Sequence, residues 1–279
     1  MTLEELLPQL RFLDGVENAV LWKLRKDPSL VESIAETAYQ TEDFALCRRK
    51  PLTRLAVVTH LLLRKYEDYK ARGIPDDVIF DTFRDVSLRA NLYFKTNGKA
   101  GLSKQDVIWL RHIMNVSLFQ LGALQFQPFE MVYLDEQTLG EPYMTFAPAQ
   151  KERLPSGAPV INCHVPRGAD LSPEAVEASF GNARAFFSRH FPDVRYQAFL
   201  CYSWLLYPPM LRLLSDTSNI KRFASHFSII GSCPDSEQAI ECLLLSPKKP
   251  GHGVGMTSLQ KLASESIERF GYACGVMEM

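Results

Sequence analysis

The sequence predicts an α+β or α/β protein, with a helical N-terminal domain at residues 1–156 followed by a mixed β-sheet domain flanked by helices at residues 157–279. Two observations predict this architecture. Apolar residues recur at helical spacing from Leu3 to about Leu121, whereas short apolar strands alternate with helices from Pro159 onward. The length of 279 residues suits one large domain or two ordinary ones.

The helices of the first half are recognised by their start and stop signals. Such signals are a Pro in the first turn, a Ser or Thr before it, and a Gly after the last turn. Four of these helices are expected to begin at Pro28, Thr53, Pro75 and Ser103. The first of the four should bury Leu30, Ile34, Ala38 and Tyr39, because these residues recur along one stripe.

The pattern changes after the helices. Residues 122–134 (GALQFQPFEMVYL) alternate apolar and polar residues around a bend, which predicts a hairpin or two short strands. Residues 135–159 are rich in Pro, Gly, Glu and Gln, and we interpret them as a loop or linker rather than a core element. The domain boundary is therefore expected at residues 156 and 157.

The second half follows an order of strand, helix, strand, helix and strand. A helix is expected from Ser172-Pro173 to about His190, and a final one over Ser258–Phe270. Strands are expected at Pro159–Val165, Arg195–Leu206, Ser225–Gly231 and Tyr272–Met277, a short helix at Pro208–Leu214, and Ala239–Leu245 is a candidate further strand.

Composition narrows the classes of function. Lys and Arg number 31 against 32 Asp and Glu, so we expect neither nucleic acid nor an anionic membrane as partner. The six cysteines are scattered without a C-x-x-C pair or a His cluster, which indicates reduced thiols and no metal site. No signal peptide or membrane-spanning run is recognised, so a cytoplasmic protein is expected. The oligomeric state stays open.

Two segments have the strand, loop and helix context of a phosphate site, where backbone N–H groups at a helix start hold an anion. The first runs from His164 to Ser172 and contains Arg167 and Gly168. The second, at residues 248–255, has two lysines and the glycines Gly251, Gly253 and Gly255. Each is equally consistent with an ordinary surface loop.

His164 is the candidate general base, because strand alternation places it on one face with Val160 and Asn162. The alternative is a strand-end histidine bonded to backbone. Cys163 should point to the opposite face, which disfavours it as a nucleophile. In the next strand Tyr202 and Trp204 are expected on one face and Ser203 on the other.

The stretch VINCHVPRGADLSPEAVEASFGNARAFFSRHFP, followed by FLCYSWLL, SNIKRF and HFSIIG, resembles the C-terminal domain of a bacterial group of two-domain acyltransferase-like proteins with a GNAT-like fold. The helical half, including LGALQFQPFEMVY, resembles the N-terminal domain of the same group. The resemblance implies an acyl-CoA-dependent N-acyltransferase that moves an acetyl or other acyl group to the amine of a small molecule or peptide. Acyl-CoA would be the co-substrate, without a metal.

The resemblance also implies residue roles. It implies that the CoA pyrophosphate lies on the loop from Pro166 to Ser172. The pantetheine arm would enter a slot between the strand that ends at His164 and the strand that contains Tyr202 and Trp204. Under this resemblance the cofactor-binding residues are Pro166, Arg167, Gly168 and Ser172, the catalytic residues are His164 and Ser203, and the candidate acceptor-binding residues are Tyr202, Trp204 and Asn219.

The sequence departs from the family pattern in two places. The first loop has Gly168 but lacks the second Gly of the usual motif, and Tyr202 replaces the His expected before Ser203-Trp204. A non-catalytic binding or regulatory protein that keeps a degenerate GNAT fold is therefore the alternative. A thiol enzyme that uses one of the cysteines is a third, weaker hypothesis.

Overall fold

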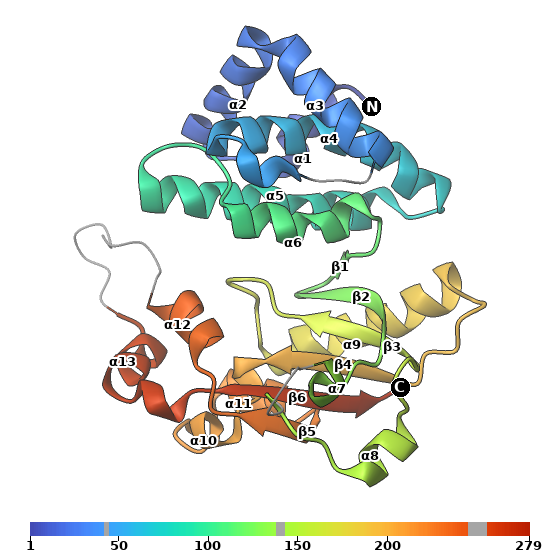
Figure 1. Ribbon diagram of the computed structural model, residues 1–279, viewed down its shortest axis with the longest axis vertical. Coiled ribbons are helices and arrows are strands. Elements are labelled where there is room, and N and C mark those ends of the chain that lie inside the picture. The colour runs from blue at the N-terminus through green and yellow to red at the C-terminus, as the bar shows by residue number, and fades with distance from the viewer. Residues whose placement is uncertain (42–44, 138–142, 245–255) are drawn as a thin grey trace. The chain divides into compact units, whose positions relative to one another are not determined.

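The computed structural model describes residues 1–41, 45–137, 143–244 and 256–279 (Figure 1). The chain forms two compact units, Met1–Gln120 and Leu121–Met279. The division falls within strand β1 (Phe119–Leu121), whereas the sequence placed it at residues 156 and 157. The physical reason is that β2 (Leu124–Glu130) pairs with β3 (Pro159–His164) along its length, so the predicted hairpin is part of the sheet.

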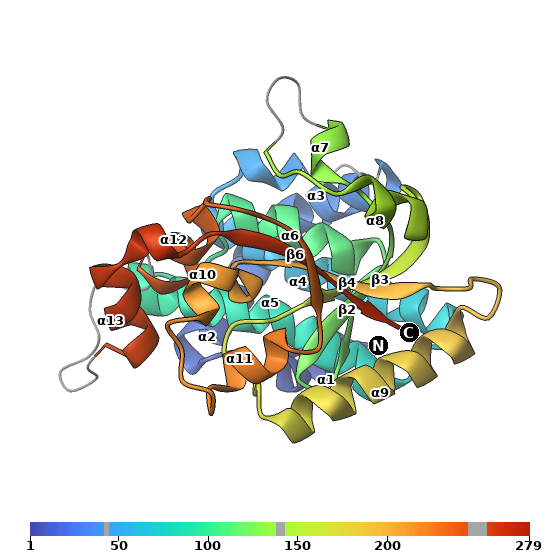
Figure 2. The ribbon, with the colours of Figure 1, turned by 90° about the horizontal axis from the view of Figure 1, so that it is seen from below.

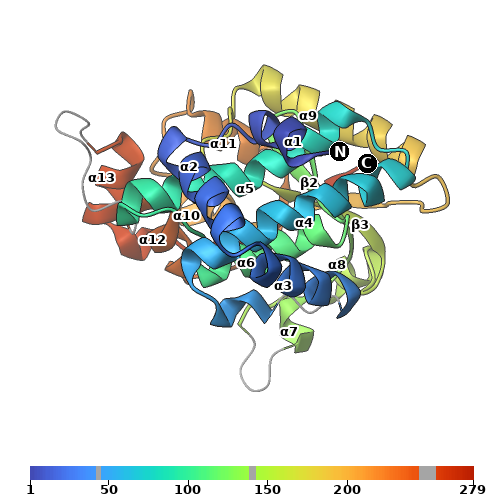
Figure 3. The same cartoon turned by 90° about the horizontal axis from the view of Figure 1, so that it is seen from above.

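The first unit is helical, as predicted. Its longest helices are α4 (Pro51–Ala71) and α5 (Asp76–Asn97), and α4 contacts most of the others (Figure 3). The remaining elements are α1 (Leu3–Leu10), α2 (Asp14–Lys26), α3 (Pro28–Thr41), the 3-10 turn η1 (Ala45–Arg48) and α6 (Lys104–Met114). Ser103 caps α6 in a capping box with Asp106, and Gly98 ends α5 at φ 66°, as the sequence signals predicted.

Two details of the helical unit differ from the prediction. The buried residues of α3 are Val31, Ala35 and Ala38, whereas Leu30 is exposed, so the predicted stripe was wrong by one position for most of its members. Thr53 lies inside α4 and is buried, because the helix already begins at Pro51. Pro is favoured at this first position since it has no N–H to satisfy.

The second unit is built on a mixed sheet of order β1-β2-β3-β4-β6-β5. On the far side of β4 lies β6 (Tyr272–Glu278), and beyond it β5 (Ser228–Cys233) forms one edge of the sheet. β3 and β4 (Ala198–Ser203) run parallel, while β2 with β3, β4 with β6, and β5 with β6 are antiparallel. The parallel pair needs a crossover, which is α9 (Pro173–His190), with the bounds that the sequence predicted.

Helix α9 covers one face of the sheet (Figure 2). The ring of Phe180 on α9 lies 5.7 Å from that of Phe126 on β2 and 5.0 Å from that of Phe199 on β4, measured between centroids. Both contacts are edge-to-face, a favoured geometry for buried aromatic rings. This aromatic cluster fixes the crossover against the strands.

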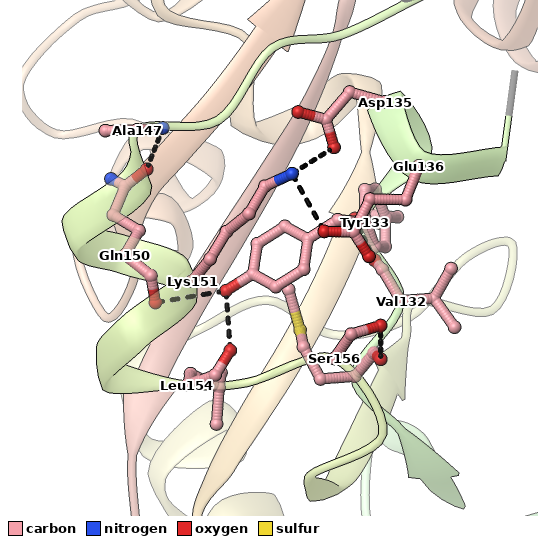
Figure 4. A network of polar contacts seen from close by, with 11 residues as sticks. Val132, Tyr133, Asp135, Glu136, Ala147, Gln150, Lys151, Leu154 and Ser156 are labelled. Carbon is pink, nitrogen blue, oxygen red and sulfur yellow. Dashed lines mark hydrogen bonds and ion pairs between the residues drawn. The ribbon is translucent and has the colours of Figure 1, made fainter.

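The opposite face is covered by residues 131–137 and 143–158, so our interpretation of residues 135–159 as a linker outside the core was wrong for the part that the structure describes. Met131, Tyr133 and Leu154 are buried against the sheet, and the segment includes α7 (Leu134–Gln137) and α8 (Pro148–Arg153). The Tyr133 hydroxyl donates to the Leu154 carbonyl at 2.7 Å (Figure 4). The polar side chains of this segment form a network between α7 and α8, in which Lys151 Nζ donates to Asp135 and Glu136.

The remaining elements are short. They are the 3-10 turns η2 (Trp204–Leu206) and η3 (Ile267–Arg269), and the helices α10 (Pro208–Leu211), α11 (Asn219–Ala224), α12 (Glu237–Leu243) and α13 (Ser258–Glu265). The candidate strand at Ala239–Leu245 was wrong, because α12 occupies its described part. A short apolar run does not distinguish strand from helix by periodicity. No helix in the described ranges is long and apolar enough to cross a membrane.

Candidate active site

The two parallel strands at the centre of the sheet pair only at their beginnings. Three partners are joined, from Val160 with Ala198 to Asn162 with Leu200. Beyond them, β3 stays paired with β2 as far as His164, and β4 stays paired with β6 as far as Ser203. The C-terminal ends of β3 and β4 are therefore not hydrogen-bonded to each other. Because the two strands are parallel, both ends lie at the same edge of the sheet.

A tight turn follows β3. The Ala169 N–H donates to the Pro166 carbonyl at 3.1 Å, and Gly168 at the third position has φ +78°. This left-handed conformation favours Gly. A Cβ at Gly168 would meet nothing within 4 Å, so the backbone conformation alone explains the Gly. Arg167 Nη2 donates to the Cys242 carbonyl at 3.0 Å, which attaches the turn to α12.

The start of α9 leads away from this turn. Ser172 is its N-cap and Pro173 its first residue, as predicted, but the Ser172 side chain makes no capping hydrogen bond. Asp170 Oδ1 instead accepts from the Ser172 N–H at 2.9 Å. The first N–H groups of a helix have no acceptor within the helix. The backbone N–H groups at the start of α9 can therefore bind an anion, and the Ser172 side chain does not accept their hydrogen bonds.

Polar side chains are buried on one face of β2 and β3. The register places Gln127 opposite Asn162 and Gln125 opposite His164. His164 Nε2 lies 3.1 Å from Gln127 Oε1, so the imidazole is held by a side chain rather than only by backbone. Asn162 is 9% exposed, and its buried Oδ1 has no hydrogen-bond partner among the residues that the structure describes. A buried carbonyl oxygen without a donor is unusual and indicates a site for an incoming N–H or O–H group.

Sequence reasoning placed His164 and Asn162 on one face but missed the two glutamines. The signal was present, because Gln125 and Gln127 flank Phe126 in the alternating segment LQFQPF. Only the pairing of β2 with β3 makes them neighbours of His164. That pairing joins segments separated by the buried stretch that we took for a linker.

The candidate residues of β4 have different surroundings. Ser203 is buried at the strand end, at the same edge of the sheet as His164, and its Oγ accepts from the Leu205 N–H at 3.1 Å. Tyr202 donates its hydroxyl to the Val132 carbonyl at 2.7 Å, and burial raises the pKa of this phenol. The predicted shared face of Tyr202 and Trp204 was wrong, because the chain leaves the strand at Trp204 and enters η2.

The other candidates are dispersed. Trp204 is buried against Phe270, with ring centroids 6.1 Å apart, so it belongs to a core cluster. Asn219 is exposed at the first position of α11, and Ser218 before it is the N-cap. The alternative phosphate loop with Gly251, Gly253 and Gly255 lies outside the described residues.

Two buried cysteines, Cys163 and Cys274, do not suit nucleophilic chemistry. Cys163 lies on the face opposite His164 and is buried together with Cys201. Burial raises the pKa of Cys163 well above its usual range and that of Cys274 to about 12. A thiol is a nucleophile in its ionised form, so both groups are inert at neutral pH. Among the described residues, no group of His, Cys, Asp and Glu could hold a metal ion.

Comparison with known families decides the relationship. Residues 118–277 match the GNAT-like C-terminal domain, and residues 1–116 match the N-acyltransferase N-terminal domain. The chain belongs to the two-domain N-acyltransferase family. The resemblance seen in the sequence is thus confirmed, and a search of curated proteins gives no significant match.

Solved structures share the fold of this N-acyltransferase family member. Structures of an acyltransferase with decanoyl-CoA and teicoplanin and with CoA and 10C-teicoplanin both align with a TM-score of 0.74, at 21% and 20% identity. A third, with decanoyl-CoA, aligns at 0.71 and 19% identity. Each alignment covers 99% of this chain and 87% of the other. The predicted fold, helical and then GNAT-like, is confirmed.

Proposed function

We propose that this protein transfers an acyl group, acetyl or longer, from acyl-CoA to an amine of a small-molecule acceptor. The observation that carries the proposal is the end of the parallel pair. β3 and β4 stop pairing after three residue partners, and β3 leads directly into the Gly168 turn and the start of α9. Unpaired strand ends beside an anion site suit a ligand with a linear amide arm and a pyrophosphate.

In this proposal the CoA pyrophosphate lies on Pro166, Arg167, Gly168 and Ser172. Backbone N–H groups of the turn and of the first turn of α9 neutralise part of its charge. The pantetheine arm runs between the ends of β3 and β4. The thioester then lies between the ends of β3 and β4, with His164 on one face of the sheet and Ser203 on the other.

The reaction needs one base and one donor. The amine nitrogen attacks the thioester carbonyl carbon, the C–S bond breaks, and CoA leaves as a thiolate. His164 accepts the proton that the amine loses, with its ring held by Gln127 at 3.1 Å. Ser203 Oγ accepts from the Leu205 N–H, and its hydroxyl proton donates to the developing negative charge.

The structural neighbours support the choice of substrates. They hold decanoyl-CoA or CoA, and two of them hold teicoplanin or 10C-teicoplanin as well. An acyl chain longer than acetyl and an acceptor of small-molecule size are therefore the first to test. The family name supports an amine as the acceptor group.

The proposal is tested by turnover. The full chain is incubated with acetyl-, octanoyl- or decanoyl-CoA and a panel of amines that includes teicoplanin. Release of the CoA thiol and the mass of the acylated product are measured. We expect at least one acyl-CoA and amine pair to turn over, and His164→Gln to lower kcat by about 10²-fold or more.

The matched control is His190→Gln, at the far end of α9 from the turn. It should leave kcat unchanged. Equal turnover by the His164→Gln variant would remove His164 from the mechanism. Failure of every acyl-CoA to bind would favour the alternative of a non-catalytic protein with a degenerate fold.

A further inference from the structure

The first turn of α4, in the helical unit, is unusually positive. Arg48, Arg49 and Lys50 precede the helix directly, and Arg54 lies one turn inside it. The first turn contains no acidic residue, and the N-cap Lys50 makes no capping bond. A helix start already carries positive partial charge, so cations are disfavoured there and anions are favoured. This helix end has the opposite of the usual charge arrangement.

Arg54 is also buried without a partner. Its exposure is 6%, and its Nε and Nη1 atoms are buried with no hydrogen bond to any described residue. Nor does Arg54 form an ion pair with any residue that the structure describes, whereas Arg64 and Arg89 in the same unit are paired with carboxylates. A buried charge without a counter-charge is strongly unfavourable, so an anionic ligand beside Arg54 would stabilise the folded state.

The general lean of helix side chains relates Arg54 to the helix start. Side chains on a helix lean toward its N-terminus, so Arg54 extends over the first turn, where the N–H groups of Leu52 and Thr53 have no acceptor within the helix. The turn is firmly packed, because the Leu102 N–H donates to the Pro51 carbonyl at 3.2 Å. Gly101 lies so close that a Cβ there would be 2.5 Å from the Pro51 Cβ and 3.2 Å from the Leu52 nitrogen, so the backbone donor that we assign to the ligand is the Thr53 N–H.

We propose that Arg54 and the first turn of α4 form an oxyanion-binding site for a ligand that carries a phosphoryl or carboxylate group. The planar guanidinium fork and the Thr53 N–H match two oxygens of either group. Arg48, Arg49 and Lys50 are exposed and add positive potential around the entrance. The site lies in the helical unit, whereas the proposed CoA loop lies in the sheet unit.

The test measures the melting temperature of the full chain in chloride, phosphate and acetate at equal ionic strength. A ligand that binds only the folded state raises the melting temperature. We expect phosphate or acetate to raise it above the value in chloride, with phosphate alone indicating a phosphoryl ligand and both indicating that a carboxylate suffices. Arg54→Met should lose this rise, while Arg25→Met, an exposed cation in the same unit, should keep it.

The CoA loop could also take phosphate, so the difference between wild type and Arg54→Met is the quantity that decides. In chloride, Arg54→Met should melt no lower than wild type, because it removes an unpaired buried charge. If Arg54→Met does not fold, Arg54→Lys keeps the charge but lacks the fork, and its affinity for the oxyanion should fall by about tenfold. Absence of any oxyanion effect in wild type, or an unchanged effect in the Arg54 variants, would overturn the proposal.

Discussion

Among the described residues, Asn162 has a buried, unpartnered oxygen that a ligand could satisfy. Its side chain is buried beside Gln127 and one strand step from His164, and its Oδ1 lacks a donor. Leaving such an oxygen unsatisfied costs about 1–3 kcal/mol of folding free energy. We infer that the acceptor amine donates to this oxygen, which would position its nitrogen near His164.

This inference predicts opposite effects of Asn162→Leu on stability and on activity. The free energy of unfolding should stay equal or rise by about 1 kcal/mol, because an unsatisfied buried oxygen is removed. The KM for the amine should rise by about tenfold, with the KM for acyl-CoA unchanged. Urea denaturation and steady-state kinetics measure both. A loss of stability with unchanged KM would assign Asn162 a purely structural role.

At the scale of elements, two glycines allow the role of the turn after β3 to be tested apart from general backbone strain. Gly168 and Gly157 both have positive φ, +78° and +80°, and a Cβ at either would meet nothing within 4 Å. Val at either position therefore introduces the same kind of backbone strain, about 1–2 kcal/mol. Only Gly168 belongs to the proposed CoA loop.

We predict that Gly168→Val weakens CoA binding by about tenfold or more, because the strained turn moves the N–H groups that hold the pyrophosphate. Gly157→Val should destabilise the fold to a similar extent and leave CoA affinity intact. Isothermal titration with CoA compares the two variants. Equal affinities would show that the turn does not hold CoA.

The pair of helices α3 and α4 should make the stability of the protein depend on pH. His60 on α4 is half-buried beside Glu32 and Arg64, in a polar groove of about 430 Å³. Burial lowers the pKa of His60 below its ordinary value of 6.5, with a smaller raising effect from Glu32 and a further lowering by Arg64. The unfolded chain therefore binds a proton at a higher pH than the folded chain does.

The sign of the effect follows from this difference. Above the ordinary value both states are neutral and His60 has no effect; as the pH falls below it, the unfolded state is protonated first and the free energy of unfolding decreases. His60→Gln should lose less stability than wild type between about pH 8 and about pH 5.5. Urea titrations at the two pH values measure this. An identical loss in the variant would contradict the assigned pKa direction.

Local sequence signals predicted individual elements better than they predicted the layers. Ser172-Pro173 and Ser103 marked helix starts correctly, because N-cap and first-turn preferences are local. The strand expected near Ala239 is a helix, since an apolar run of this length fits either form. Residues 143–158 of the predicted linker cover a face of the sheet despite their polar composition, and only tertiary packing reveals the buried Met144, Phe146 and Leu154.

At the scale of the molecule, the near-zero net charge means that an anionic cofactor is bound by local groups. The family assignment supports acyl-CoA as the ligand, and we propose that it binds at the unpaired ends of β3 and β4. The candidate site could be predicted in part, because His164 and the turn to Ser172 are contiguous in sequence. Gln127 and the orphan oxygen of Asn162 depend on strand register, which no local signal determined.

The most direct test of acyl-CoA binding at this position is hydrogen–deuterium exchange of the full chain with and without decanoyl-CoA. Amides that contact the ligand or are shielded by it exchange more slowly. We predict slower exchange in residues 163–176, which contain the end of β3, the Gly168 turn and the start of α9. We predict the same for residues 201–205, at the end of β4. Unchanged exchange in both segments at a saturating concentration of decanoyl-CoA would contradict binding of acyl-CoA at this position.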